Sequence, residues 1–151
     1  GSENGYLAIG FSHPEYLISL GSYPHYNLII WNWRSGKQVY SVDTPIHDLE
    51  NQIIRISTSK PQFTAQLGKD SGRLLIWSLN PNPGFSTYER VSLPKRAIPV
   101  HMDWSPHQED PLLAVVDEFG HVYLSNKNAS EITRIIFSQR CATCLDYEIP
   151  A

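Results

Sequence analysis

The sequence has little of what several large classes of protein require. Only two of its 151 residues are cysteine, Cys141 and Cys144, too few for the disulfide framework of a small secreted domain. Charged residues make up 18% of the chain, and 12 basic against 15 acidic residues give a net charge of −3. A nucleic-acid binder normally carries a basic face, and no apolar run approaches the ~20 residues of a membrane-spanning helix. We therefore expect neither nucleic acid nor a membrane as partner.

Patterns typical of catalytic and metal sites are also missing. There is no Gly-x-Ser-x-Gly nucleophile elbow. Cys141 and Cys144 form a CxxC pair, but a structural zinc site needs four ligands, and neither a second CxxC nor a His-x₃-His motif accompanies the pair. The six histidines show no metal-ligand spacing. We predict no cofactor, no metal and no catalytic residue, and we interpret both cysteines as structural.

Short apolar segments are abundant, and the 11 prolines and nine glycines lie between them. None of these segments keeps a 3.6-residue apolar period over ten or more residues, and the mostly polar stretch 44–53 is typical of a loop. Strand-length runs bounded by turn-forming residues predict an all-β chain. The predicted strands are 6–11, 16–20, 27–33, 53–57, 63–67, 74–79, 112–116, 122–125 and 132–137.

Two independent sequence markers repeat with a period near 46 residues. Gly72 and Gly120 each stand before an apolar strand, and their two segments align with an offset of 48, while 24–33 aligns with the strand ending in Trp77 at an offset of 46. The second marker is a large apolar residue before a polar turn, and its positions are Phe11, Ile56, Trp104 and Tyr147, at intervals of 45, 48 and 43. Such self-similarity indicates a repeat architecture.

Each period holds four short strands with a tight turn between the second and the third, which predicts one blade of a β-propeller. The fold expected is an all-β, partial β-propeller of about three degenerate blades with four antiparallel strands each. The expected divisions are 3–43, 44–95 and 96–139, with 140–151 as the first strand of a fourth blade and 1–2 as a remnant of cloning from a longer protein. The residues predicted to build the blades are Phe11, Trp31, Trp33, Asp70, Gly72, Trp77, Trp104 and Gly120.

These strands resemble those of WD40 repeats. Phe-Ser-His-Pro at 11–14 and Trp-Ser-Pro at 104–106 are similar to the first strand of such a repeat, and the runs 28–32 and 75–78 are similar to the end of its third strand. The third block carries Ser125 in place of tryptophan, and no Gly-His dipeptide precedes a first strand. The hydrogen-bonded Asp-His-Ser-Trp set of well-kept blades is therefore incomplete.

A narrower resemblance is to the WD-repeat cilia- and flagella-associated proteins. It rests on residues 16–36, where a proline-aromatic insertion replaces the Asp-Gly turn before a Trp-x-Trp strand, and on residues 76–94. The resemblance implies a scaffold in the complex that tethers or regulates inner-arm dynein on the axoneme, with other axonemal proteins as partners. A general cytoplasmic WD40 adaptor is the alternative that the repeats alone allow.

A propeller hydrolase is the third hypothesis, and the residues argue against it. Glycosidase propellers carry Ser-x-Asp-x-Gly-x-x-Trp boxes, whereas 68–72 lacks the leading serine and Trp77 stands five residues after Gly72. We predict a chain that acts by presenting surfaces. The elongated turn with Tyr23, His25 and Tyr26 is interpreted as exposed and is the first candidate for partner binding. Because three blades cannot close a ring, we also expect the chain to self-associate through open strand edges.

Overall fold

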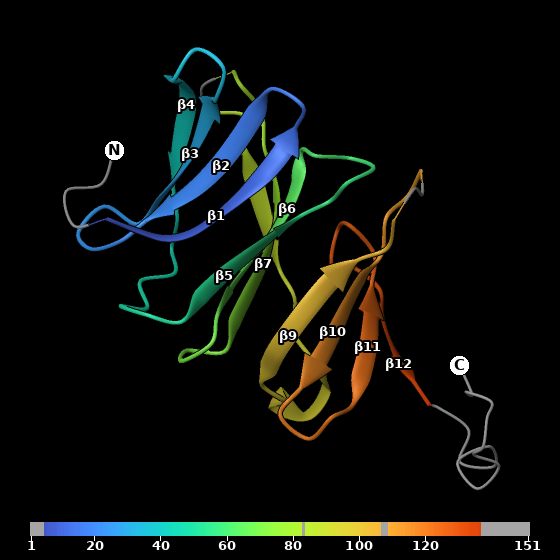
Figure 1. Ribbon diagram of the computed structural model, residues 1–151. Helices are drawn as coiled ribbons and strands as arrows, with labels where there is room; N and C mark the ends of the chain where they lie inside the picture. The colour runs from blue at the N-terminus through green and yellow to red at the C-terminus, as the bar shows by residue number, and fades with distance from the viewer. Residues whose placement is uncertain (1–4, 83, 107–108, 137–151) are drawn as a thin grey trace, which may run out of the picture.

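The computed structural model describes residues 5–82, 84–106 and 109–136. In these ranges twelve strands form three antiparallel sheets of four strands, each sheet following the order of its strands in the chain (Figure 1). Blade 1 holds β1 (Tyr6–His13), β2 (Tyr16–Gly21), β3 (Asn27–Asn32) and β4 (Lys37–Asp43); blade 2 holds β5 (Gln52–Ile56), β6 (Phe63–Gly68), β7 (Arg73–Ser78) and β8 (Thr87–Arg90); blade 3 holds β9 (Pro99–Trp104), β10 (Leu113–Asp117), β11 (Val122–Ser125) and β12 (Ile132–Ile135). The predicted all-β fold with four-stranded antiparallel blades is confirmed.

The position of a strand in its blade determines how deeply it is buried. The middle strands β3 and β7 are apolar on both faces, and Leu28–Ile30 and Leu74–Trp77 are buried without interruption. The last strand of each blade, β4, β8 or β12, has no buried side chain. Strand β8 is exposed along its whole length and lacks an apolar pattern, which is why it is absent from the predicted strands. Each blade therefore presents a core in its middle and a solvent-facing outer strand.

The blades pack face to face, and the core consists of two layers between them. Alternate residues of β7 face opposite neighbours: Leu75 and Trp77 pack against blade 1, whereas Leu74 and Ile76 pack against blade 3. The first layer joins Ile18, Leu20, Leu28 and Ile30 to blade 2, and the second joins Met102, Trp104, Leu113, Val115 and Tyr123 to it. Full burial of each such side chain contributes about 1.5–3 kcal/mol.

The first strands of the blades approach one another, β1 beside β5 and β5 beside β9 (Figure 1). The connections between strands gather at two ends of the stack. The connections after the first and the third strand of each blade lie at one end, which we call the upper rim because it is uppermost in Figure 1. We call the opposite end the lower rim. This arc of blades, with first strands innermost and fourth strands outermost, is the arrangement of a β-propeller.

The outward faces of blades 1 and 3 have no neighbouring blade among the described residues. Phe11, Leu17 and Trp31 stand opposite one another on β1, β2 and β3 and so share the outward face of blade 1. Phe11 is 71% exposed there. The corresponding face of blade 3 carries four half-buried aliphatic side chains, Ala114, Val116, Val122 and Leu124.

Helical structure is minimal in the described ranges. The chain between blades 2 and 3 contains one 3-10 turn, η1 (Pro94–Arg96), and nowhere in the described part is a helix long and apolar enough to cross a bilayer. The segment 140–151, predicted as the first strand of a fourth blade, lies outside the described residues, as do Cys141 and Cys144.

Candidate interaction surface

The side chains that the repeats single out divide into a buried set and a surface set. Trp77 is the most deeply buried tryptophan, at 2% exposure, and its indole N–H donates to Gln66 Oε1 at 2.9 Å. Gln66 in turn donates to Gln52 Oε1 at 3.0 Å and to Thr44 Oγ1 at 3.2 Å. All three polar partners of this network are buried. The network links β7, β6 and β5 to the β4–β5 connection and holds blade 2 together through its core.

Sequence reasoning missed this network because its members are not the Asp, His and Ser of the WD40 pattern. The available signal was a polar residue in the middle of a strongly apolar strand: Gln66 lies between Ala65 and Leu67, and all three are fully buried. Such a residue needs hydrogen-bond partners in the core, since a buried polar group without them is costly. Blade 1 has a smaller equivalent, in which Trp31 Nε1 donates to Ser19 Oγ at 2.8 Å.

Blade 3 is organised around Asp117, which is 1% exposed. Its carboxylate accepts hydrogen bonds from the backbone N–H groups of Phe119 and His121 at 2.9 and 2.8 Å, and from the Tyr123 hydroxyl at 3.1 Å. Burial acts to raise the pKa of Asp117, but these hydrogen bonds outweigh it and hold the pKa below 3.8. Asp117 is therefore an ionised residue that closes the turn containing Gly120, at φ +85°.

The equivalent turn of blade 2, between β6 and β7, is stabilised by an acid that lies outside the turn. Gly72 adopts φ +74°, in the left-handed region that glycine enters readily. In this turn the backbone N–H of Ser71 donates a hydrogen bond to Asp48 Oδ2 at 2.9 Å. Asp70 is exposed and instead lies 3.3 Å from the side-chain amide of Asn51. The stabilising carboxylate thus comes from the β4–β5 connection, which is distant from the turn in the sequence.

The remaining predicted blade residues lie near the upper rim. Trp104 is buried, and its indole N–H donates to Arg55 O of blade 2 at 2.8 Å. Trp33 lies beyond the end of β3, is 42% exposed, and donates to Pro14 O at 2.9 Å. It contacts Phe11 edge to face at 6.3 Å and lies under the Arg34 guanidinium at 4.7 Å. Phe11 and Trp33 are therefore surface residues here, because both lie toward the open side of blade 1.

The aromatic turn Ser22–Tyr26 lies on the lower rim and is only partly exposed. Tyr23 is 58% exposed and His25 is also exposed, but Tyr26 is 5% exposed. The left-handed conformation of Tyr26 (φ 44°) turns its ring onto His47, and the two rings stack at 4.9 Å. The prediction that Tyr26 is exposed is therefore wrong, because the β4–β5 connection folds over it. Tyr23 and His25 remain predicted contacts for a partner.

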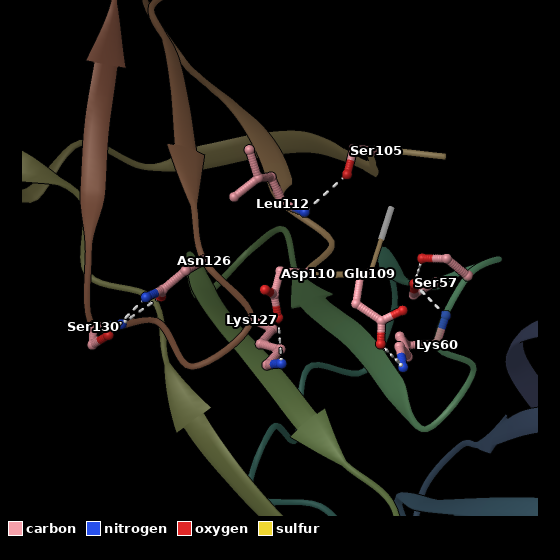
Figure 2. A network of polar contacts seen from close by, with 10 residues as sticks. Ser57, Lys60, Ser105, Glu109, Asp110, Leu112, Asn126, Lys127 and Ser130 are labelled. Carbon is pink, nitrogen blue, oxygen red and sulfur yellow. Dashed lines mark hydrogen bonds and ion pairs between the residues drawn. The ribbon is translucent and has the colours of Figure 1, made fainter. Parts of the chain in front are cut away.

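Two charged pairs lie at the upper rim: one joins blades 2 and 3, and the other lies within blade 3 (Figure 2). Lys60 Nζ lies 2.9 Å from Glu109 Oε1, and Lys127 Nζ lies 2.8 Å from Asp110 Oδ1. Lys127 also approaches the ring of Phe63 at 5.5 Å. The hydrogen bond and the charge of Lys127 lower the pKa of Asp110. The first pair joins the β5–β6 connection to the β9–β10 connection, whereas the second joins the β9–β10 connection to the β11–β12 connection (Figure 2).

The neighbouring part of the upper rim, between blades 1 and 2, is hollowed and uncharged. A cavity of about 330 Å³ opens there, lined among others by Tyr16, Ile30, Tyr40, Pro61 and Leu79. Burial raises the pKa of the Tyr40 phenol, which stays neutral well above neutral pH. In the described ranges, no group of three or more His, Cys, Asp or Glu side chains is placed to hold a metal ion. This part of the upper rim can therefore bind a partner through its shape and its apolar side chains.

No family model and no curated protein matches this sequence. Solved structures with a similar fold include the WD40 domain of SCAP from fission yeast and the β-propeller domain of Cps50 (Swd1) from Myceliophteria thermophila. Each covers 93% of this chain with a TM-score of 0.57, at 14% and 12% sequence identity. The chain spans 33% of the first structure and 41% of the second.

Together with the three four-stranded blades, these likenesses define the class of fold. The described residues form a partial β-propeller of the WD40 type. The expected WD40 fold is thereby confirmed from the structure, although the repeat signatures in the sequence are degenerate. At this level of identity the likeness defines the fold alone.

Proposed function

We propose that this chain is a non-catalytic scaffold that binds other proteins through the rims of its blades. The observation that carries the proposal is the upper rim, where an uncharged cavity between blades 1 and 2 lies next to the ion-paired margin of blades 2 and 3. Exposed aromatic side chains extend the same rim at Phe11 and Trp33. Aromatic and apolar side chains held by a rigid sheet are typical of protein-binding surfaces.

The particular setting we propose is the axoneme of cilia and flagella, in a complex that tethers or regulates inner-arm dynein. This proposal rests on the resemblance of residues 16–36 and 76–94 to the cilia- and flagella-associated WD-repeat family, nearest to its member forty-three. In the structure those segments lie on β2, β3, β7 and β8. The alternative is a cytoplasmic WD40 adaptor or complex-assembly subunit, which the blades support equally.

Affinity capture with the immobilised chain distinguishes these settings. Extracts of one cell line are compared before and after it forms cilia, and the bound proteins are identified by mass spectrometry. Enrichment of dynein-arm proteins and tubulin only after ciliation supports the axonemal setting. The same set of bound proteins in both extracts supports the adaptor. If neither extract yields a protein that binds above the bead control, the scaffold proposal fails.

A further inference from the structure

Two neighbouring cavities between blades 1 and 2 form one elongated groove. The upper cavity of about 330 Å³ and a second one of about 220 Å³ share Tyr40 and Pro81 in their walls. The second cavity runs beside Tyr40–Val42 of β4 and is closed on its other side by the β7–β8 connection, with Asn80 and Ser86. We call this hollow the β4 groove. Its length along a strand fits an extended chain better than a compact small molecule.

The described residues that line the β4 groove include no charged side chain. Apolar and aromatic groups dominate the upper cavity, while the second cavity adds the small polar side chains Ser41, Asn80, Asn82 and Ser86. A charged ligand group placed there would lose its hydration without gaining a counter-ion, which is costly. The groove therefore selects an uncharged segment that has apolar side chains and ordinary hydrogen-bonding groups.

Strand β4 presents a free edge along this groove. It is the outermost strand of blade 1 and pairs with β3 on its inner side. Among the described residues, none outside β3 forms a backbone hydrogen bond with residues 38–42. Because alternate residues of an edge strand direct their N–H and C=O groups outward, this edge can accept another strand.

A β-bulge adapts β4 to the groove. Ile30 pairs with Tyr40 and Trp31 pairs with Gln38, so that Val39 is an extra residue without a partner in β3. Strict alternation would place Val39 and Tyr40 on opposite faces, yet both line the upper cavity. Bulges often redirect a side chain in this way beside a functional site. Val39 is also 45% exposed, so its side chain is accessible at the mouth of the cavity.

We propose that the β4 groove binds an extended, uncharged peptide segment of a partner protein, which adds a strand to β4 and places alternate apolar side chains in the upper cavity. Backbone hydrogen bonds to the edge supply affinity in such a complex, and the cavity supplies specificity. The inference rests on the proposed scaffold function, for which it names a binding site and the chemistry of the partner segment.

Fluorescence anisotropy with a defined probe tests the proposal. The probe is a fluorescein-labelled heptapeptide of alternating threonine and leucine, titrated with the complete 151-residue chain. Saturable binding is expected. Val39→Glu, which places a carboxylate at the cavity mouth, should weaken binding by about tenfold or more, because no cation lies there to pair with it. Asn128→Glu is the matched control: it adds the same charge at an exposed position of blade 3, away from β4 and from the groove walls, and should leave binding unchanged.

Two methylated probes test the strand-addition mode. One carries N-methyl groups on every leucine and the other on every threonine, so that each blocks one edge of the peptide. Exactly one edge faces β4, and therefore only one methylated probe should lose binding. Equal binding of both methylated probes, equal binding by the Val39→Glu chain, or no saturable binding of the parent probe would each overturn the proposal. The capture experiment, which needs no groove, tests the scaffold function separately.

Discussion

Replacement of Gln66 by leucine should be one of the most damaging single changes in this chain. Gln66 is fully buried, and its amide accepts from Trp77 Nε1 and donates to Gln52 Oε1. Leucine has a similar volume and fills the same space, but it offers neither an acceptor nor a donor. The change leaves the packing of β6 largely intact and removes only the polar contacts of the network.

The expected cost follows from the groups left without partners. The Trp77 N–H and the Gln52 carbonyl oxygen stay buried after the change. Each unsatisfied group costs about 1–3 kcal/mol, so Gln66→Leu should lower the free energy of unfolding by about 2–6 kcal/mol. Since a domain of this kind is stable by about 5–15 kcal/mol in total, a large share of the stability is at stake.

Urea unfolding followed by far-ultraviolet circular dichroism measures this cost. Ser19→Ala, which removes the buried hydroxyl that accepts from the half-buried Trp31 indole N–H, is the control and should cost about 1 kcal/mol. The substitution Trp77→Phe should lower the free energy of unfolding by at least about 1 kcal/mol less in the Gln66→Leu chain than in the wild type. The reason is that the indole N–H is already unpaired in the Gln66→Leu chain. A Gln66→Leu chain within about 0.5 kcal/mol of the wild type would mean that the buried network contributes little to stability.

Two further predictions concern buried polar groups. The Thr64 hydroxyl is buried without a hydrogen-bond partner among the described residues. Thr64→Val should therefore raise the free energy of unfolding by about 1 kcal/mol, whereas Thr64→Ser, which keeps the hydroxyl, should not. A valine variant that unfolds at a lower urea concentration than the wild type would contradict this prediction. The pKa of Asp117 is lowered in the fold, so its contribution to stability is present above pH 3.8 and is lost as the pH falls through the lowered pKa. Asp117→Asn should remove this part of the acid dependence in pH-jump unfolding curves, and an unchanged acid limb would contradict the assignment.

The sequence was sufficient to predict the blades because its periodic features act locally. Strand-length apolar runs and the glycines at 72 and 120 specify strands and tight turns through their own backbone preferences. The two-sided burial of Leu28–Ile30 and Leu74–Trp77 also follows from continuous apolar runs. The outer strands β4 and β8 could not be found in this way, because an exposed outer strand needs no apolar alternation. Strand β9 is also absent from the predicted strands, although its last residue, Trp104, is one of the repeat markers.

The contacts that the sequence did not reveal join residues distant along the chain. Tyr26 is buried only because the connection with His47 returns across it, and Asp48 replaces Asp70 because that same connection reaches the next turn. Phe11 carries the residue type of a blade core yet is exposed, since no described blade covers its face. The repeat pattern predicts on which face of its blade a residue lies. Whether that face is covered depends on which blade or connection packs against it in the folded chain.

The described residues form an open arc of three blades, and none of them covers the apolar outward faces of blades 1 and 3. Light scattering after size exclusion, over a range of concentrations, shows whether these faces drive association. We expect a mass above 17.2 kDa that rises with concentration. Leu124→Lys, on the outward face of blade 3, should reduce the association, and the exposed Asn128→Lys should not. A folded monomer of 17.2 kDa at every concentration would mean that these faces do not associate and that the open arc is wrong.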